Sequence, residues 1–391
     1  MKRIFSLGMV ILMLAALVVS GACAAPTVVE TGAAEIAALE KEVAALEKEI
    51  AKVEAAVPVP AEVFEWDLYS TYTVKTLTSA SWWWFYKYVD EVYNLTDGRI
   101  DITTYFMGEH PYKIFDGLKI IRDVGPAIVE LACAQVSGED PRFGVTDLPL
   151  LFPPRADLYH KVLDEAIVPD YLTPIIAEYG YQPLITHCWS AQRIGGVGFV
   201  VTDWDSLKGK KIRIWNPQLA DTITMLGGIP QSISWGEVYT SLATGLIDGV
   251  VTNSGAMVDN KFFEVLTSLT LSELQFGAYP YCVNKDALDA LPADLSEKLL
   301  AWAEKTQPEN RIAQDSYIDH ATLKGLIGLG FEMAAPSPSF VDEVRDKCWE
   351  GVWEPWIERA GGPGTPAADA FNVVAKVLID AGYTVPNYKP Y

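Results

Sequence analysis

Arg213 stands in a sequence setting that suits the binding of a carboxylate. It lies between Ile212 and Ile214, in a segment that has the pattern of a buried strand. Side chains alternate between the two faces of a strand, so Arg213 is expected to point away from both isoleucines. A guanidinium offers two parallel N–H donors that match a carboxylate. A structural ion pair is the competing explanation, because charged residues are rarely buried unless they are paired.

Tryptophans lie close in sequence to Arg213 and to a second arginine, Arg193. Three of the twelve tryptophans, Trp189, Trp215 and Trp235, belong to this region. Aromatic rings beside an anion-binding arginine suit an aromatic or bulky apolar acid better than a small dicarboxylate. Each tryptophan taken singly is more often a core residue, so the preference for such an acid rests on the group.

Other classes of function find little support in the sequence. The chain of 391 residues carries a formal net charge of −21, which opposes nucleic-acid binding. It has four histidines and neither an HExxH nor a CxxC motif, so no metal site is expected. It also lacks the GxSxG and SxxK motifs of hydrolases. We therefore expect neither an enzyme nor a resident cofactor.

The first 23 residues have the pattern of a bacterial export signal. Lys2 and Arg3 precede an apolar run from 4 to 19, and small residues lead to Cys23. We favour processing at Cys23, which would anchor the mature protein by a lipid outside the cytoplasm, over ordinary signal cleavage. Four cysteines would then meet an oxidising compartment, where disulfides in three pairings and buried thiols are both open: Cys133, Cys188, Cys282 and Cys348.

A linker and a heptad-patterned helix are expected over residues 24–62. Apolar residues recur at spacings of three and four from Ile36 to Val57, and prolines at 58 and 60 end the pattern. Glutamates at the flanking positions oppose parallel pairing of identical helices. Two roles stay open: a stalk (residues 36–57) that associates with itself or a partner, and a stiff spacer between the anchor and the next domain.

An α/β domain is expected from about residue 63 to the C-terminus. Strands are predicted over 64–70, 99–106 and 197–201, and helices over 79–94, 294–306, 339–360 and 367–381. Strands and helices alternate until about Asp286, and helices dominate after it. This alternation is typical of α/β architecture.

Several motifs in this domain resemble those of the substrate-binding proteins of TRAP-type (tripartite ATP-independent periplasmic) transporters. The matching segments are SLKGKKIRI around Arg213, then WGEVY and TGLIDG between 235 and 249. The passages TDGRI at 96–100 and DLPLLF at 147–152 also match. The resemblance covers roughly residues 64–391. It implies a two-lobed, type II-like periplasmic binding protein whose lobes are joined by crossing strands and a long helix.

The same resemblance implies where the lobes begin and end and which residues bind the ligand. Lobe I would comprise about 63–190 and 279–318, and lobe II about 191–278 and 319–391. Arg213 would clamp a ligand carboxylate in the cleft. Six further side chains are candidates to contact the ligand: Arg193, Asn253, Trp215, Trp235, Trp189 and Trp82.

Arg193 precedes two glycines where a segment crosses between the lobes, and a surface cation would explain it nearly as well. Asn253 lies just past Asp248-Gly249, where the family often presents an amide or an acid. The family branch that binds a metal uses an acid in this stretch. No acid occurs between Gly249 and Asp259, so no metal is expected.

The sequence therefore predicts an extracytoplasmic receptor that binds an organic acid and delivers it to the membrane subunits of a TRAP transporter. A ligand-sensing subunit of a membrane signalling protein is the alternative, and an exported hydrolase is less well supported. Arg213→Ala is expected to abolish ligand binding and to leave the fold intact.

Overall fold

The computed structural model describes residues 41–48, 62–70, 80–153, 155–313 and 320–390. The chain divides into two compact units, Met1–Ala61 and Glu62–Tyr391. In the first unit, residues 41–48 are helical, and Leu46 of the predicted heptad pattern is exposed. The export signal, Cys23 and the rest of the heptad pattern lie outside the described residues and stay predictions.

Nine strands in the described part of the second unit form one mixed sheet. They are β1 (Phe64–Tyr69), β2 (Ile100–Tyr105), β3 (Ile128–Glu130), β4 (Tyr181–Gly196), β5 (Lys211–Ile214), β6 (Ile229–Ser232), β7 (Gly249–Thr252), β8 (Ser268–Asn284) and β9 (Glu332–Ala334). Their order is β2-β1-β3-β8-β4-β7-β5-β6, and β9 pairs with β8. Short parallel strands lie at both ends of the sheet, as expected for an α/β fold.

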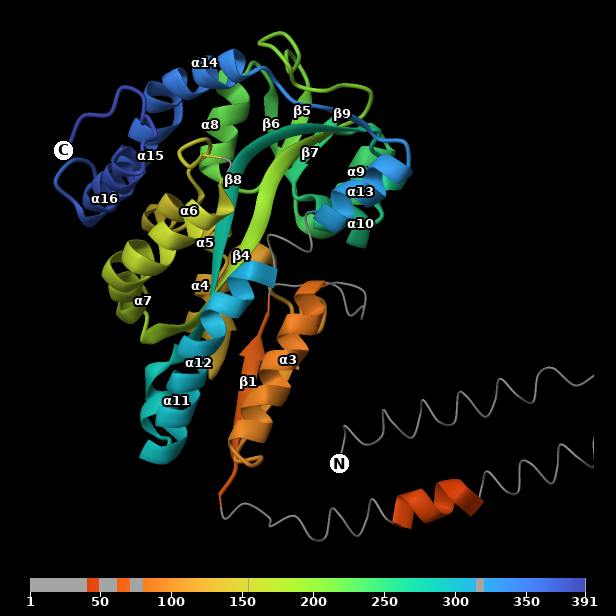
Figure 1. The fold of residues 1–391 in the computed structure, drawn as a ribbon, viewed down its shortest axis with the longest axis vertical. Helices are drawn as coiled ribbons and strands as arrows, with labels where there is room; N and C mark the ends of the chain where they lie inside the picture. Colours follow the sequence, from red (N-terminus) through yellow and green to blue (C-terminus); the bar gives the residue numbers. More distant parts are fainter. Residues whose placement is uncertain (1–40, 49–61, 71–79, 154, 314–319, 391) are drawn as a thin grey trace, which may run out of the picture. The chain divides into compact units, whose positions relative to one another are not determined.

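The long strands β4 and β8 connect the two ends of this sheet. One end of β8 pairs with β3 at Val283, and the other pairs with β9 at Ser268. β4 runs antiparallel to β8 and pairs with β7 from Arg193 onward. These are the crossing strands of the two-lobed fold, and Figure 1 shows them running between two groups of helices.

The strand predicted over 197–201 is wrong. β4 ends at Gly196, and Gly198 has a φ of +73°, a left-handed backbone that interrupts a strand. Arg193 therefore lies inside a crossing strand and not before one. The strands predicted over 64–70 and 99–106 are confirmed as β1 and β2, within a residue at each end.

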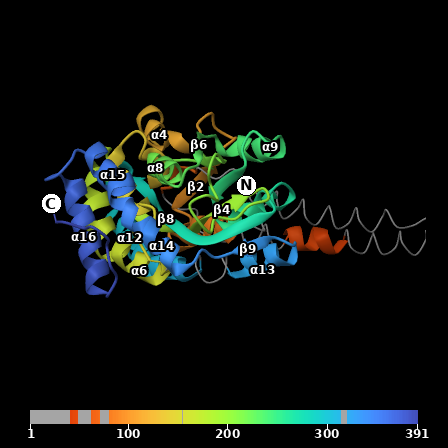
Figure 2. The ribbon, with the colours of Figure 1, turned by 90° about the horizontal axis from the view of Figure 1, so that it is seen from above.

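Helices flank the sheet. The larger ones are α3 (Ala80–Leu95), α8 (Pro217–Met225), α12 (Ala293–Ala313), α13 (His320–Gly328), α14 (Pro338–Cys348) and α16 (Pro366–Asp380). Shorter ones are α4 (Gly117–Asp123), α5 (Cys133–Val136), α6 (Ala156–Val162), α7 (Thr173–Glu178), α9 (Val238–Ala243), α10 (Ser254–Asp259), α11 (Lys285–Asp289) and α15 (Glu354–Arg359). The helix predicted over 339–360 is divided by the π-helical turn η7 (Trp349–Trp353) into α14 and α15. Seen from above, α15 and α16 lie on one side of β4 and β8, and α9 and α13 on the other (Figure 2).

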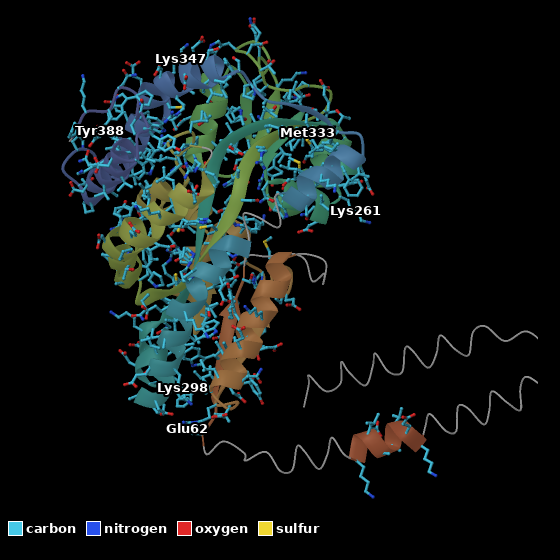
Figure 3. The ribbon with its side chains drawn as sticks, viewed as in Figure 1. Glu62, Lys261, Lys298, Met333, Lys347 and Tyr388 are labelled. Carbon is cyan, nitrogen blue, oxygen red and sulfur yellow. The ribbon has the colours of Figure 1, made fainter. Side chains whose placement is uncertain are left out.

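Two tryptophans of the C-terminal segment, Trp353 and Trp356, donate hydrogen bonds to the distant segment 141–149. The Trp353 indole N–H donates to the carbonyl of Pro149 at 2.9 Å, and the Trp356 N–H donates to that of Pro141 at 2.8 Å. Both side chains are fully buried. Farther along this layer, Lys347 of α14 (labelled in Figure 3) lies 4.2 Å from the ring centroid of Trp204. The C-terminal segment therefore supports the 3-10 helix η2 (Pro141–Asp147).

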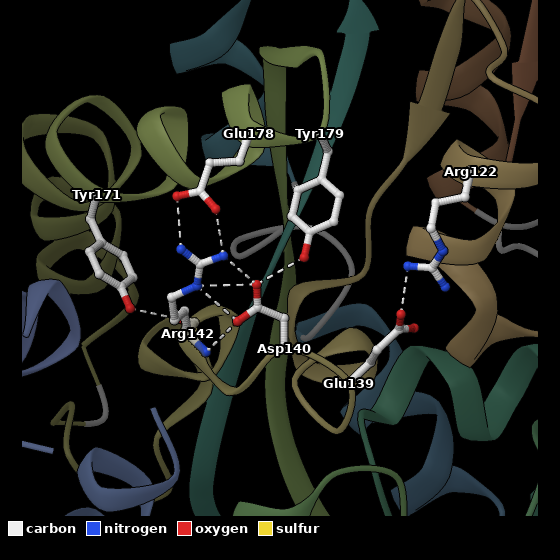
Figure 4. Close-up of polar contacts among 7 residues, drawn as sticks. All are labelled: Arg122, Glu139, Asp140, Arg142, Tyr171, Glu178 and Tyr179. Carbon is white, nitrogen blue, oxygen red and sulfur yellow. Dashed lines mark hydrogen bonds and ion pairs between the residues drawn. The ribbon is translucent and has the colours of Figure 1, made fainter. Parts of the chain in front are cut away.

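A network of charged and polar side chains holds the start of η2 (Figure 4). The Arg142 side chain donates two hydrogen bonds of 2.9 Å to Glu178 and three of 2.8–3.2 Å to Asp140. The hydroxyl of Tyr179 donates to the same Asp140 carboxylate, and that of Tyr171 donates to the carbonyl of Arg142. The bidentate contact fixes the orientation of the Arg142 guanidinium and ties the start of η2 to Glu178 of α7.

Candidate functional site

Arg213 occupies the middle of a three-stranded parallel segment. Its neighbours across the sheet are Gln231 of β6 and Val250 of β7. The side chain is 2% exposed, and its Nε donates to the carbonyl of Ile233 at 3.0 Å. Within the part of the chain that the structure describes, no carboxylate forms an ion pair with it. Arg213 is thus a buried cation without a counter-ion there.

Two indole rings enclose the Arg213 guanidinium. Its central carbon lies 5.3 Å from the ring centroid of Trp215 and 5.2 Å from that of Trp235. Such cation–π contacts compensate only in part for lost hydration. Burial consequently lowers the pKa of Arg213, and the field of the nearby Tyr279 hydroxyl opposes this shift. An anion that entered the site would compensate for the missing hydration of the cation.

A cavity of about 620 Å³ opens beside this arginine. One wall comes from α5 and the chain after it, through Gln135, Gly138 and Glu139. The facing wall comes from the end of β5 and from α8, and the lining there includes Trp215 and Asn216. Among the described residues, the Trp215 Nε1 and Asn216 Nδ2 atoms are buried and have no hydrogen-bond partner. The cavity therefore offers N–H donors from Trp215 and Asn216, and the Trp215 ring also contacts the Arg213 guanidinium.

Tyr279 links this cavity to the crossing strands. Its hydroxyl donates to the Gln135 Oε1 atom at 2.9 Å, and its ring meets the Trp189 ring edge-on at 5.2 Å between centroids. Neither Gln135 nor Tyr279 was indicated by the motifs. Gln135 follows the carboxyl end of β3, where ligands commonly bind in α/β sheets, so that rule could have identified it. Tyr279 has no comparable local signal.

The structure gives structural partners to two of the sequence-predicted site residues. Arg193 is 3% exposed and forms an ion pair of 3.1 Å with Glu273 of β8, so it is not a surface cation. Asn253 is the N-cap of α10, and its Oδ1 accepts a hydrogen bond of 2.7 Å from the Ala256 N–H. A ligand could use only what remains of these side chains, above all the Asn253 Nδ2 atom.

Only some of the predicted site residues contact one another. Arg213, Trp215 and Trp235 form one cluster, and Trp189 stands on β4 beside Tyr279. The backbone of Trp82 belongs to α3, and its side chain lies outside the described residues. Four cysteines are buried free thiols in the structure, which is one of the two states left open by the sequence: Cys133, Cys188, Cys282 and Cys348.

No group of three or more histidines, cysteines and carboxylates in the described ranges could hold a metal ion. Among the helices described, none combines the length and the apolar character needed to cross a bilayer.

Sequence comparison identifies relatives of this chain. The model of the family described as bacterial extracellular solute-binding protein, family 7, matches residues 85–349. The C4-dicarboxylate-binding periplasmic protein DctP of Rhodobacter capsulatus is 35% identical over 113 residues, which are 28% of this chain and 34% of that protein. The ectoine-binding periplasmic protein TeaA of Halomonas elongata is 26% identical over 245 residues, covering 59% of this chain and 68% of that protein. The match to DctP thus spans only about a third of that relative.

Solved structures resemble this chain over most of its length. DctP7 of Bordetella pertussis, a receptor that binds pyroglutamic acid, superposes with a TM-score of 0.70 at 18% identity and covers 79% of this chain and 100% of its own. DctPAm of Advenella mimigardefordensis, in complex with galactonate, gives a TM-score of 0.71 at 20% identity, with 81% and 99% covered. At such identities the likeness shows the fold, which is that of a two-lobed solute receptor.

Proposed function

Because this chain belongs to the bacterial extracellular solute-binding proteins, family 7, we propose that it binds an organic acid beside Arg213 and delivers it to TRAP-type membrane subunits. The family consists of receptors and not of enzymes. In this proposal the ligand carboxylate pairs with the Arg213 guanidinium, and closure of the two lobes encloses it. The closed receptor then presents the ligand to the membrane.

The observation that carries the proposal is the buried Arg213 without a carboxylate partner among the described residues. Natural proteins seldom leave a cation in this state, because desolvation of an uncompensated charge costs several kcal/mol, on the order of 5. Arg193, at a similar depth, has Glu273 as its counter-ion. A ligand carboxylate would complete Arg213 in the same way.

The cavity supports a small organic acid as the ligand. Its volume of about 620 Å³ falls within the usual range of ligand pockets, about 300–1,000 Å³. Similar receptors have been solved with acids bound, among them pyroglutamic acid, galactonate and succinate. Trp215 and Trp235 provide apolar walls next to the arginine, which suits an acid with a bulky or aromatic body.

A thermal-shift screen of the purified protein tests the proposal. The panel contains dicarboxylates, keto acids, sugar acids and aromatic acids, each beside its neutral amide. A ligand that binds only the folded state raises the melting temperature by mass action. We expect a rise for one class of acid and none for its amide. If no carboxylate raises the melting temperature, the proposed function is wrong.

Asn253→Asp separates the two possible roles of this residue. Aspartate caps a helix as well as asparagine does, and its charge at the helix N-terminus offsets its desolvation at this buried position, so the melting temperature should change little. The variant replaces the Nδ2 donor with a negative oxygen, so we expect affinity for the carboxylate to fall roughly tenfold. Calorimetry measures the affinity. Asn253→Ala serves as the reference for loss of the cap, at about 1 kcal/mol of stability. Unchanged affinity in Asn253→Asp would leave Asn253 with the cap alone.

A further inference from the structure

A second uncompensated ionisable group faces the crossing strands. Asp147, at the end of η2, is 1% exposed. Its Oδ2 atom is 2.5 Å from the Thr146 hydroxyl, and its Oδ1 atom has no hydrogen-bond partner among the described residues. No cation pairs with it there. Burial accordingly raises the pKa of Asp147 well above its usual range, although the Thr146 hydroxyl favours the ionised form.

Asp147 packs against β8 at Gly277, beside two aromatic residues of the site. A Cβ atom built on Gly277 would lie 2.9 Å from the Asp147 Oδ1 atom, 3.0 Å from the Tyr279 ring and 3.6 Å from the Trp189 ring. The Asp147 Oδ1 atom therefore faces Gly277, where β8 has no side chain. Tyr279 connects this place to the cavity through its hydrogen bond to Gln135.

Gln275 adds further unused hydrogen-bonding groups. It precedes Gly277 by two positions, so its side chain leaves the strand on the same face. It is 2% exposed, and within the described residues neither its Nε2 nor its Oε1 atom has a partner. Buried amides are nearly always hydrogen-bonded, and one unpaired in both atoms indicates a missing partner.

We propose that the ligand is a zwitterion, an amino or imino acid whose carboxylate binds Arg213 while its ammonium group binds Asp147 and Gln275 beside the Trp189 and Tyr279 rings. This inference rests on the proposed function. Contacts connect the two places, because the Tyr279 hydroxyl donates to Gln135, which lines the same cavity as Trp215, and the Trp215 ring contacts the Arg213 guanidinium. Aromatic rings beside a carboxylate are a favourable setting for an ammonium group. A zwitterion compensates both buried groups at once.

The alternative ligand with two carboxylates fits this end of the cleft less well. Its second carboxylate would meet the Asp147 carboxyl, and within the described residues no arginine or lysine pairs with that group. Burial already raises the pKa of Asp147, and a second carboxylate beside it would oppose its ionisation further, whereas a cation would favour its ionised form. The ammonium of a zwitterion instead gives Asp147 the counter-ion it lacks.

Matched pairs of ligands test the proposal by calorimetry with the full chain. The pairs are alanine and propanoate, proline and cyclopentanecarboxylate, and phenylalanine and 3-phenylpropanoate, which differ only in the amine. In at least one pair we expect the amino or imino acid to bind roughly 10- to 100-fold more tightly, as for a charged buried hydrogen bond. Asp147→Asn should remove this preference by lowering the affinity for the amino or imino acid toward that of its amine-free partner.

Two further variants provide an independent test and a control. Gln275→Met removes the amide at similar volume and should weaken the same preference, even if Asp147→Asn folds poorly. Asp157→Asn changes an exposed carboxylate on α6 and should have no effect. Equal affinity within every pair, or a preference that survives in both Asp147→Asn and Gln275→Met, overturns the zwitterion. If all three pairs fail to bind while another carboxylate stabilises the protein, the zwitterion is wrong and the proposed function stands. If no carboxylate stabilises the protein, both are wrong.

Discussion

Replacing Arg213 with methionine is expected to abolish carboxylate binding and, in the same protein, to raise the stability of the unliganded receptor. Binding depends on the guanidinium fork, and loss of one partner from a buried charged contact weakens binding by roughly 100-fold or more. Calorimetry with the acid found in the thermal-shift screen measures this loss.

The stability gain follows from the environment of Arg213. In the absence of ligand it is a fully buried cation between Trp215 and Trp235, with one hydrogen bond to the Ile233 carbonyl. Methionine is of similar length, packs well against aromatic rings and carries no charge to desolvate. We expect the free energy of unfolding to rise by about 1–3 kcal/mol, by analogy with buried ion pairs replaced by apolar residues. Urea denaturation of the unliganded protein measures this change.

Arg193→Met is the matched control, and it is expected to change the free energy of unfolding in the opposite direction. Arg193 is as deeply buried as Arg213, but it is paired with Glu273. Its removal leaves that carboxylate partly buried without a cation, which should lower the free energy of unfolding by about 1–3 kcal/mol. A clear loss of stability in Arg213→Met would show that the arginine has a structural role and would contradict its assignment to the ligand.

Trp353→Ala should cause the largest loss of stability, about 3–5 kcal/mol, the usual cost of removing a buried aromatic side chain. The indole is fully buried, contacts Phe371 at 6.0 Å between ring centroids and donates to the Pro149 carbonyl. Its removal leaves a cavity and a buried carbonyl without its donor. The shift in the urea midpoint gives the magnitude.

Trp353→Phe divides this loss into its two parts. Phenylalanine keeps most of the apolar volume but cannot donate to Pro149, so about 1–2 kcal/mol should be lost. Because Pro149 is only two residues from Asp147, both variants should also reduce the amine preference in the matched ligand pairs. A loss below about 1 kcal/mol in Trp353→Ala would mean that the C-terminal helices do not support η2.

The local elements of the receptor could be predicted because their signals are local. Alternating apolar residues indicated β1 and β2, and helical periodicity indicated α3, α12 and α16. The motifs from 206 to 249 predicted both the family and the strand that carries Arg213. The one wrong strand, over 197–201, was apolar enough, but Gly198 turns the chain at that point.

The sequence by itself determined that a carboxylate receptor of this family was to be expected and that Arg213 was its first candidate. Only the tertiary structure decided which of the charged side chains has a counter-ion. Arg193 and Glu273 are 80 residues apart in the sequence, and Arg213 has no such partner among the described residues. Asp147 and Gln275 became candidates because β8 brings them to one face beside Trp189 and Tyr279. Whether a buried polar atom has a partner depends on distances across the fold, and no local pattern of residues encodes it.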